Sequence, residues 1–180
     1  ADTAARNRAT RTMTRLCRDH GYWGLQFDIE NINVQDKALF TTWYEEAARA
    51  LHAVNCKISI AVVHRPAEFA GPLGYHRFLY ESWREAYDLA ALAKAGDFIS
   101  LMSYAQHTRR TPPGPQAGLP WMRDVVEYFL RFMPPEKLSL GIPLWGEHWF
   151  TRYDNSVPER ARSWSETVTL WAWPISASTR

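Results

Sequence analysis

The chain has 180 residues, a hydrophobic fraction of 46% and a formal net charge of +2. This length is enough for one domain with a substantial core, but short for a complete eight-stranded α/β barrel, which typically needs ~250 residues. The small net charge argues against a nucleic-acid partner, and no apolar run approaches the roughly 18 residues of a membrane span.

The first part of the chain predicts a helix, a strand, a second helix and a second strand. Residues 3–19 have a weakly apolar stripe and stop at Gly21, and residues 24–30 follow as a strand. Asp36 caps a strongly periodic helix that runs to about residue 54. Residues 57–63 are almost continuously apolar, which is typical of a strand buried on both faces.

The same alternation continues through the rest of the chain. A Pro- and Gly-rich loop from residue 64 to 74 precedes a helix at 78–94, for which Gly96 suits the left-handed position after the last turn. A strand at 98–104 and a second loop, 105–120, come next.

An amphipathic helix at 121–133 ends at two prolines, and 138–144 is the fourth strand. Residues 150–180 are polar and stay unassigned, although 168–173 is compatible with a strand. Helices that alternate with buried strands predict a parallel sheet, either part of a (β/α) barrel or a doubly wound sheet. No glycine-rich phosphate-binding motif follows a strand, which lowers the nucleotide-binding alternative.

Residues 25–31 hold the most informative pattern. Gln26, Asp28 and Glu30 alternate with Leu25, Phe27 and Ile29, so the three polar side chains share one face of the strand. Helices cover the apolar face of a parallel array, so the polar face must look into a barrel or a crevice. Two carboxylates held there repel each other and raise the proton affinity of one, as a general acid requires. A solvated strand face or a structural ion pair is the alternative.

Other residues point to no bound cofactor. Cys17 and Cys56 lack metal-ligand spacing and are expected to be packed free thiols, with a single disulfide as the alternative. The six histidines show no ligand-like pairing, so neither a metal site nor a cofactor is expected. Five arginines line one predicted helix without interleaved aromatics and indicate a solvated face: Arg6, Arg8, Arg11, Arg15 and Arg18. The chain opens on Ala1 without a signal region, as a processed form or a fragment would.

Three motifs, each at the end of a predicted strand, resemble glycoside hydrolase family 18, the chitinase-like barrels, and most nearly its spore-cortex-lytic branch. The pattern DGxDxDxE falls on residues 23–30, where Gly24, Asp28 and Glu30 match while Trp23 and Gln26 replace acids. The pattern M-x-Y-D falls on 102–105, with Ala105 in place of the acid, and G-[IV]-P-x-Y-G falls on 141–146.

The resemblance implies a truncated (β/α)8 barrel that holds strands four to seven over about residues 10–150, within one partial catalytic domain spanning 1–180. It implies a secreted or extracytoplasmic glycosidase that hydrolyses β-1,4 links beside N-acetylglucosamine, in chitin-like glycans or peptidoglycan, with no membrane span. Four strands cannot close such a barrel, so two sheet edges are expected to be unpaired or covered by the ends of the chain.

By the same resemblance, hydrolysis is assisted by the acetamido group of the substrate. Glu30 is the acid, Asp28 orients the acetamido N–H, and Tyr104 donates its hydroxyl to the acetamido oxygen. Gln26 is a neutral partner for Asp28. The expected contacts of the sugar are Gln26, Met102, Trp145 and Trp149, the two tryptophans being equally well explained as core residues.

Two other functions remain open at this point. A lectin-like barrel of the same family would bind sugar without cleaving it, although such relatives usually lose the acid that Glu30 supplies here. An unrelated parallel α/β domain would keep Asp28 and Glu30 for structural reasons. The oligomeric state is not predicted.

Overall fold

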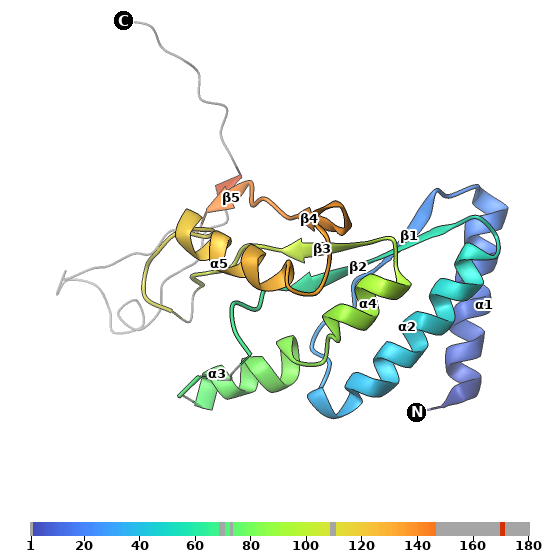
Figure 1. Cartoon of the computed structure of the whole chain (residues 1–180), viewed down its shortest axis with the longest axis horizontal. Coiled ribbons are helices and arrows are strands. Elements are labelled where there is room, and N and C mark those ends of the chain that lie inside the picture. Colours follow the sequence, from blue (N-terminus) through green and yellow to red (C-terminus); the bar gives the residue numbers. More distant parts are fainter. Residues whose placement is uncertain (1, 69–70, 73, 109–110, 147–169, 172–180) are drawn as a thin grey trace, which may run out of the picture.

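The computed structural model describes residues 2–68, 71–72, 74–108, 111–146 and 170–171. Four parallel strands form one sheet in the order β1-β2-β3-β4, and each strand is connected to the next through helices (Figure 1). The strands are β1 (Gly24–Phe27), β2 (Lys57–Val63), β3 (Phe98–Met102) and β4 (Leu138–Leu140). The predicted parallel array is therefore confirmed: β2 has the expected bounds, and the other three strands end earlier than expected.

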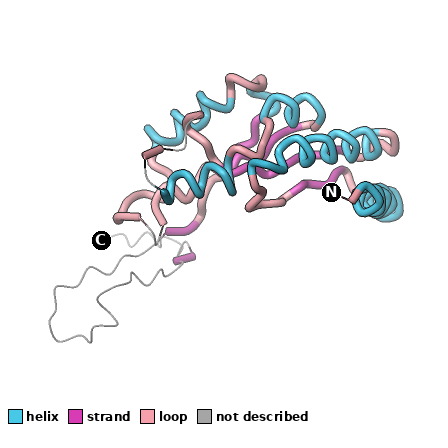
Figure 2. The backbone as a smooth tube through the Cα atoms, turned by 90° about the horizontal axis from the view of Figure 1, so that it is seen from below, coloured by secondary structure: helices cyan, strands magenta, loops and turns pink. Residues whose placement is uncertain are grey.

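Helices lie along one face of this sheet (Figures 1 and 2). The two longest helices, α1 (Thr3–His20) and α2 (Lys37–His52), pack against each other, and α2 also contacts β2. Gly21 ends α1 in the left-handed conformation, with φ of 63°, as predicted. Asp36 does precede α2, but its side chain makes no capping hydrogen bond. Instead, Asn33 caps the short 3₁₀ helix η1 (Val34–Asp36) that leads into α2.

The helix expected at 78–94 is divided into separate segments. These are α3 (Gly74–Leu79), the π-helical turn η2 (Tyr80–Arg84) and α4 (Leu89–Ala95). The break brings Ala86 and Tyr87 into the core, and Asp88 then starts α4 by accepting a hydrogen bond from the backbone N–H of Ala91 at 3.1 Å.

Gly96 does not adopt the predicted left-handed conformation, because its φ is −90° and its ψ is 173°. A Cβ atom at this position would lie 2.2 Å from the hydroxyl oxygen of Tyr44, which is fully buried under α4. The glycine is therefore explained by close packing, and the expectation based on helix termination was wrong.

The remaining elements complete the described part of the chain. Helix α5 (Leu119–Phe129) starts before the predicted 121–133 helix because Pro120 fits its first turn. The 3₁₀ helix η3 (Pro135–Lys137) leads into β4. The short strands β5 (Trp145–Gly146) and β6 (Leu170–Trp171) pair antiparallel, and the latter falls within the 168–173 segment. None of the described helices has the length and apolarity needed to cross a membrane.

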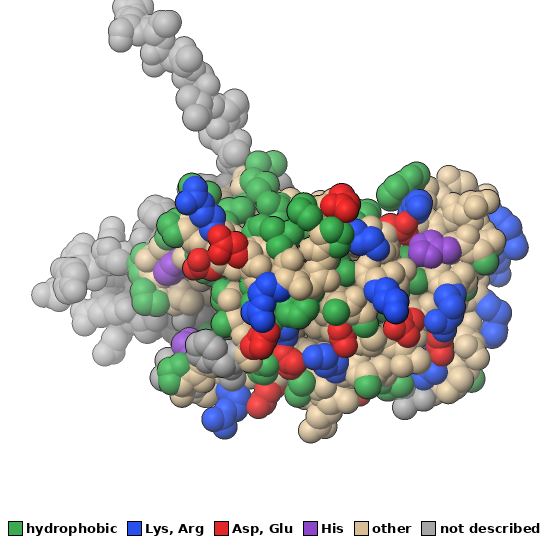
Figure 3. Space-filling view, viewed as in Figure 1, with side chains coloured by type: hydrophobic (Ala, Val, Ile, Leu, Met, Phe, Trp, Pro, Cys, Tyr) green, Lys and Arg blue, Asp and Glu red, His purple; other side chains and the backbone are tan. Residues whose placement is uncertain are grey.

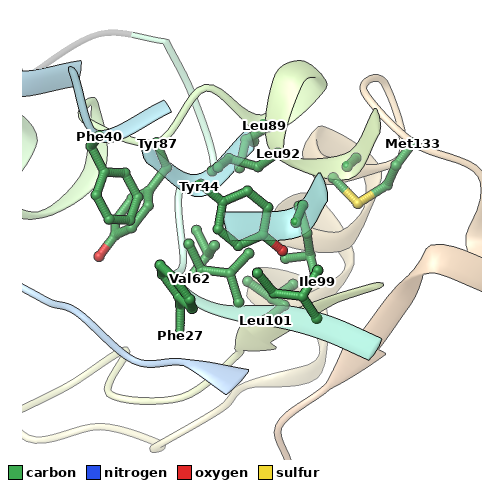
Figure 4. Close-up of a cluster of buried hydrophobic side chains, with 14 of the residues drawn as sticks. Phe27, Phe40, Tyr44, Val62, Tyr87, Leu89, Leu92, Ile99, Leu101 and Met133 are labelled. Atoms are coloured by element: carbon green, nitrogen blue, oxygen red, sulfur yellow. The ribbon is translucent and has the colours of Figure 1, made fainter. Parts of the chain in front are cut away.

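Side chains alternate between the two faces of the sheet as the sequence predicted. The core between the sheet and the helices contains Phe27 from β1 and every second residue of β2 and β3 (Figure 4). These strand residues are Ile58, Ile60, Val62, Ile99 and Leu101. Gln26 and Ser59 lie on the opposite face, where the hydroxyl of Ser59 donates to Oε1 of Gln26 at 3.2 Å.

Strands β1 and β4 are the two edges of the sheet, each paired on one side within the described residues, as four strands imply. Large apolar side chains are exposed on β4 and the segment after it, namely Leu140, Ile142 and Leu144, where hydrophobic atoms gather in Figure 3. An exposed apolar strand edge favours association with another strand.

Cys17 and Cys56 form a disulfide with a Cα–Cα distance of 6.3 Å, which corrects the expectation of free thiols. Their pairing depends on how α1 packs against α2, because Cys56 lies between α2 and β2. Reduction is expected to lower the free energy of unfolding by about 2 kcal/mol or more, because the bond closes a long loop of the unfolded chain. Denaturation of the oxidised protein and of a Cys17→Ala, Cys56→Ala variant measures this effect, and equal stability would contradict it.

Asp97 ties α2 to the beginning of β2 and β3. Its carboxylate accepts hydrogen bonds from the backbone N–H of Ile58 at 2.9 Å and from Nε2 of His52 at 2.8 Å, and pairs with Nζ of Lys57 at 2.9 Å. Burial alone would raise the pKa of Asp97, but these bonds outweigh it and lower the pKa from 3.8 to about 2.

The lowered pKa of Asp97 predicts a loss of stability in acid. The contribution of Asp97 is present above its unfolded pKa and disappears as pH falls through the folded value, so it should decline between about pH 4 and pH 2. We expect about 1 kcal/mol, reduced by solvent screening. Urea titrations across this range should show a shallower decline for Asp97→Asn, and parallel curves would contradict the assignment.

Candidate active site

The ends of three neighbouring strands lead to one cavity, whose wall includes Glu30 but not Asp28. Asp28 and Glu30 follow β1, His64 follows β2 and Tyr104 follows β3, so the acids and the tyrosine come from strands that are separated by β2. The cavity measures about 510 Å³. Its wall includes Glu30, Met102 and Tyr104 among the residues singled out from the sequence.

The acid pair has the electrostatic character that the alternating pattern predicts. Both Asp28 and Glu30 are exposed and follow the end of β1. Partial burial and then the neighbouring charge of Asp28 raise the pKa of Glu30 above 4.5. Glu30 therefore keeps its proton to a higher pH than an ordinary glutamate does.

The charges of Glu30 and Asp28 act on Tyr104. Burial, followed by the charges of Glu30 and Asp28, raises the pKa of Tyr104 above 10. The hydroxyl thus stays protonated and can donate a hydrogen bond at neutral pH. Trp145 packs edge-on against its ring at a centroid distance of 4.9 Å, and a Cβ on Gly141 would lie 2.9 Å from that ring. The glycine of the third motif therefore leaves space for Tyr104.

The backbone turns sharply after both groups. Asn31, next to Glu30, has φ of 56°, and Ala105, next to Tyr104, has φ of 60°. An alanine in this left-handed region is strained and needs support from its surroundings. That support comes from Gln116, whose Oε1 accepts a hydrogen bond from the N–H of Ala105 at 2.9 Å.

Tyr87 holds the segment between the two acids. Its hydroxyl donates to the backbone carbonyl of Ile29 at 2.8 Å, while its ring is 1% exposed in the core. Burial first, and then the charges of Glu30 and Asp28, raise the pKa of Tyr87. This tyrosine therefore fixes the backbone from which Asp28 and Glu30 extend, which the sequence pattern did not indicate.

Gln26 is placed apart from the cavity. It lines a different hollow, together with Trp23 and Phe98, and its described hydrogen bond comes from Ser59, whereas the sequence suggested one with Asp28. Trp145 touches Tyr104 but is not part of the cavity wall, and Trp149 lies outside the described residues.

The chain matches the family model "Glycosyl hydrolases family 18" over residues 1–174. The protein belongs to glycosyl hydrolase family 18. The resemblance inferred from the three motifs is thereby confirmed.

Curated relatives of this family 18 chain include two proteins of Bacillus subtilis. The chain is 26% identical to the uncharacterized glycosylase YvbX over 94% of its own length and 46% of that protein. It is 28% identical to the cortical fragment-lytic enzyme over 94% of its length and 37% of that protein. The chain thus spans less than half the length of these relatives.

Solved structures show the same fold. A chitinase from Chromobacterium violaceum superposes with a TM-score of 0.70 at 29% identity, covering 81% of this chain and 43% of that one. The putative sporulation-specific glycosylase ydhD from Bacillus subtilis gives 0.77 at 22% identity, covering 93% and 50%. The sheet of this family 18 chain is therefore of the TIM-barrel type, and its four described strands do not close a barrel.

Two further side chains of the family 18 cavity were not identified from the sequence. His64 and Arg84 line its wall, together with the aromatic ring of Trp83. The sequence offered one signal for His64, because this residue directly follows a buried strand. Arg84 lies in η2, inside what the sequence presented as a continuous helix, so nothing marked it.

Proposed function

We propose that the protein containing this chain is a glycosidase that cleaves β-1,4-linked, N-acetylglucosamine-containing glycans with assistance from the substrate. One observation carries this proposal, namely a proton-retaining Glu30 beside Asp28 at a cavity that Tyr104 also lines. Family membership supports the reaction class.

In the first step, Glu30 gives its proton to the glycosidic oxygen as the bond to the anomeric carbon breaks. The acetamido oxygen of the same sugar attacks that carbon and forms an oxazolinium ring. Asp28 accepts a hydrogen bond from the acetamido N–H and balances the positive charge, while the Tyr104 hydroxyl donates a hydrogen bond to the acetamido oxygen.

In the second step, the Glu30 carboxylate takes a proton from water as the water oxygen attacks the anomeric carbon. The ring opens, the acetamido group is restored and Glu30 is again protonated. Two displacements at one carbon retain the β configuration. No metal or cofactor is needed for this sequence.

The relatives include proteins called chitinases and cortical fragment-lytic enzymes, which supports chitin-like glycans or peptidoglycan as substrates and a place outside the cytoplasm. The assignment of residues 1–180 to one partial catalytic domain stays a prediction. The protein should be incubated with N-acetylglucosamine oligomers, and both product formation and binding should be followed. Cleavage supports the proposal, and binding without cleavage indicates a lectin-like barrel. The absence of both cleavage and binding would contradict both functions.

A further inference from the structure

Arg84 is the one side chain of the described cavity wall that carries a permanent positive charge. It is the last residue of η2 and lines the cavity together with Glu30 and Tyr104. Its Nε is buried without a hydrogen-bond partner, and no carboxylate among the described residues pairs with it. A guanidinium taken out of water is costly unless an anion meets it.

Two other arginines of the described chain that are largely removed from water have such an anion. Arg6 pairs with Glu46 at 3.3 Å, and Arg65 pairs with Glu85. Burial lowers the pKa of Arg84 and outweighs the opposing effect of Tyr75. Within the described part of the chain, Arg84 therefore differs from Arg6 and Arg65 in having no anionic partner.

Arg84 is not the partner of the catalytic acid. No ion pair joins Arg84 to Glu30 or Asp28 within the described part of the chain. It also lines a second hollow of about 280 Å³, whose described wall includes Arg65 and His76 and no carboxylate. Arg84 thus lines both hollows.

His64 adds a neutral acceptor beside the arginine. It is 7% exposed, and its Nδ1 has no hydrogen-bond partner among the described residues. Burial, and then the nearby charge of Arg84, lower the pKa of His64 to about 3, although a hydrogen bond with the backbone of Ala105 works in the opposite direction. A neutral imidazole can accept a hydrogen bond from a sugar hydroxyl.

We propose that Arg84 is a specificity-determining residue that binds a carboxylate carried on a side group of the glycan. The inference rests on the proposed function and deepens it, since it favours an acidic amino-sugar polymer over a neutral chitin-like one. The carboxylate is either that of a 3-O-lactyl ether, as in N-acetylmuramic acid, or one within a peptide attached to that ether. A planar guanidinium suits either carboxylate, because it offers two parallel N–H donors.

The test compares tetrasaccharides of equal length as substrates of the protein containing this chain. They are alternating N-acetylglucosamine and N-acetylmuramic acid with free lactyl carboxylates, the methyl ester of that glycan, and the same glycan with a dipeptide on the lactyl group. The neutral N-acetylglucosamine tetramer is the reference. The readout is the ratio of kcat/KM for each acidic glycan to that for the ester.

For the wild type we expect this ratio to be roughly tenfold or more with at least one acidic glycan, because one charge-assisted contact contributes about that much. The glycan with the higher ratio identifies whether the carboxylate belongs to the lactyl group or to the peptide. Arg84→Gln and Arg84→Met should bring the ratio toward one, and Arg84→Lys should keep part of it. Arg49→Gln removes an exposed charge on α2 and should keep the wild-type ratio.

The ester comparison needs no variant, so the preference for a carboxylate is tested even if one Arg84 variant folds poorly, and the more conservative Arg84→Lys then tests the role of Arg84. Cleavage of the neutral tetramer with a wild-type ratio near one would overturn this inference and leave the proposed function standing. A wild-type ratio that persists in Arg84→Gln would also overturn it. If the wild type cleaves none of the glycans, the proposed function fails and the inference fails with it.

Discussion

Replacing Glu30 by Gln is expected to reduce kcat on N-acetylglucosamine oligomers by roughly 10²- to 10⁴-fold. Glutamine has the same shape but no proton that it can give to the leaving oxygen, so only the transition state loses its acid. The Kd for the oligomer should stay within a few-fold of the wild-type value, since the bound sugar depends on shape and hydrogen bonds.

The measurement pairs initial rates from product chromatography with calorimetric binding on the same preparations. Glu136→Gln makes the same chemical change at an exposed position in η3 and should keep the wild-type rate. Near wild-type turnover by Glu30→Gln would show that the chemistry runs through other residues. Lost binding together with lost turnover would instead indicate a structural role for Glu30.

Replacing Asp28 by Asn is expected to slow turnover by roughly 10²-fold, but only on substrates with a 2-acetamido group. The proposed task of Asp28 is to accept the acetamido N–H and balance the oxazolinium, and asparagine loses the charge. Aryl glycosides with and without the 2-acetamido group separate this role from general damage. An equal loss on both substrates would rule out assistance through Asp28.

The same variant has a predicted effect on the pH profile. Burial and the charge of Asp28 both raise the pKa of Glu30, and the substitution removes the second cause. Glu30 should then lose its proton at lower pH, so the alkaline limb of kcat/KM should move toward acid. Asp124→Asn, at an exposed position in α5, should leave that limb in place.

Local pattern was enough to predict the features that depend on one strand or one helix at a time. The alternation from Leu25 to Glu30 predicted which side chains face the helices, and Phe27 is indeed in the core while Gln26 is not. The apolar run 57–63 predicted a strand that is buried on both faces. Each of these inferences needed only the period of a strand.

The errors come from contacts between distant segments. Gly96 is required by the hydroxyl of Tyr44, and Cys17 meets Cys56 because α1 packs against α2, which leads to Cys56. Gln26 is bonded to Ser59, its partner in the register of β1 and β2, which a single sequence does not reveal.

The candidate site was predictable where a family motif covered it and not elsewhere. The motifs marked Glu30 and Tyr104, whose strand ends the fold brings to one cavity. They did not mark Tyr87, which fixes the Ile29 backbone, or Arg84, which reaches the cavity because the expected helix is interrupted at η2. Lone residues in irregular segments become informative only once their neighbours in space are known.

The anomeric form of the first product tests the account most directly. Hydrolysis of the N-acetylglucosamine tetramer should be followed by proton NMR, at times short compared with the interconversion of the anomers. Substrate-assisted double displacement with Glu30 as acid and base predicts that the new reducing end appears first as the β anomer. Initial appearance of the α anomer would contradict the account, as would the absence of any cleavage.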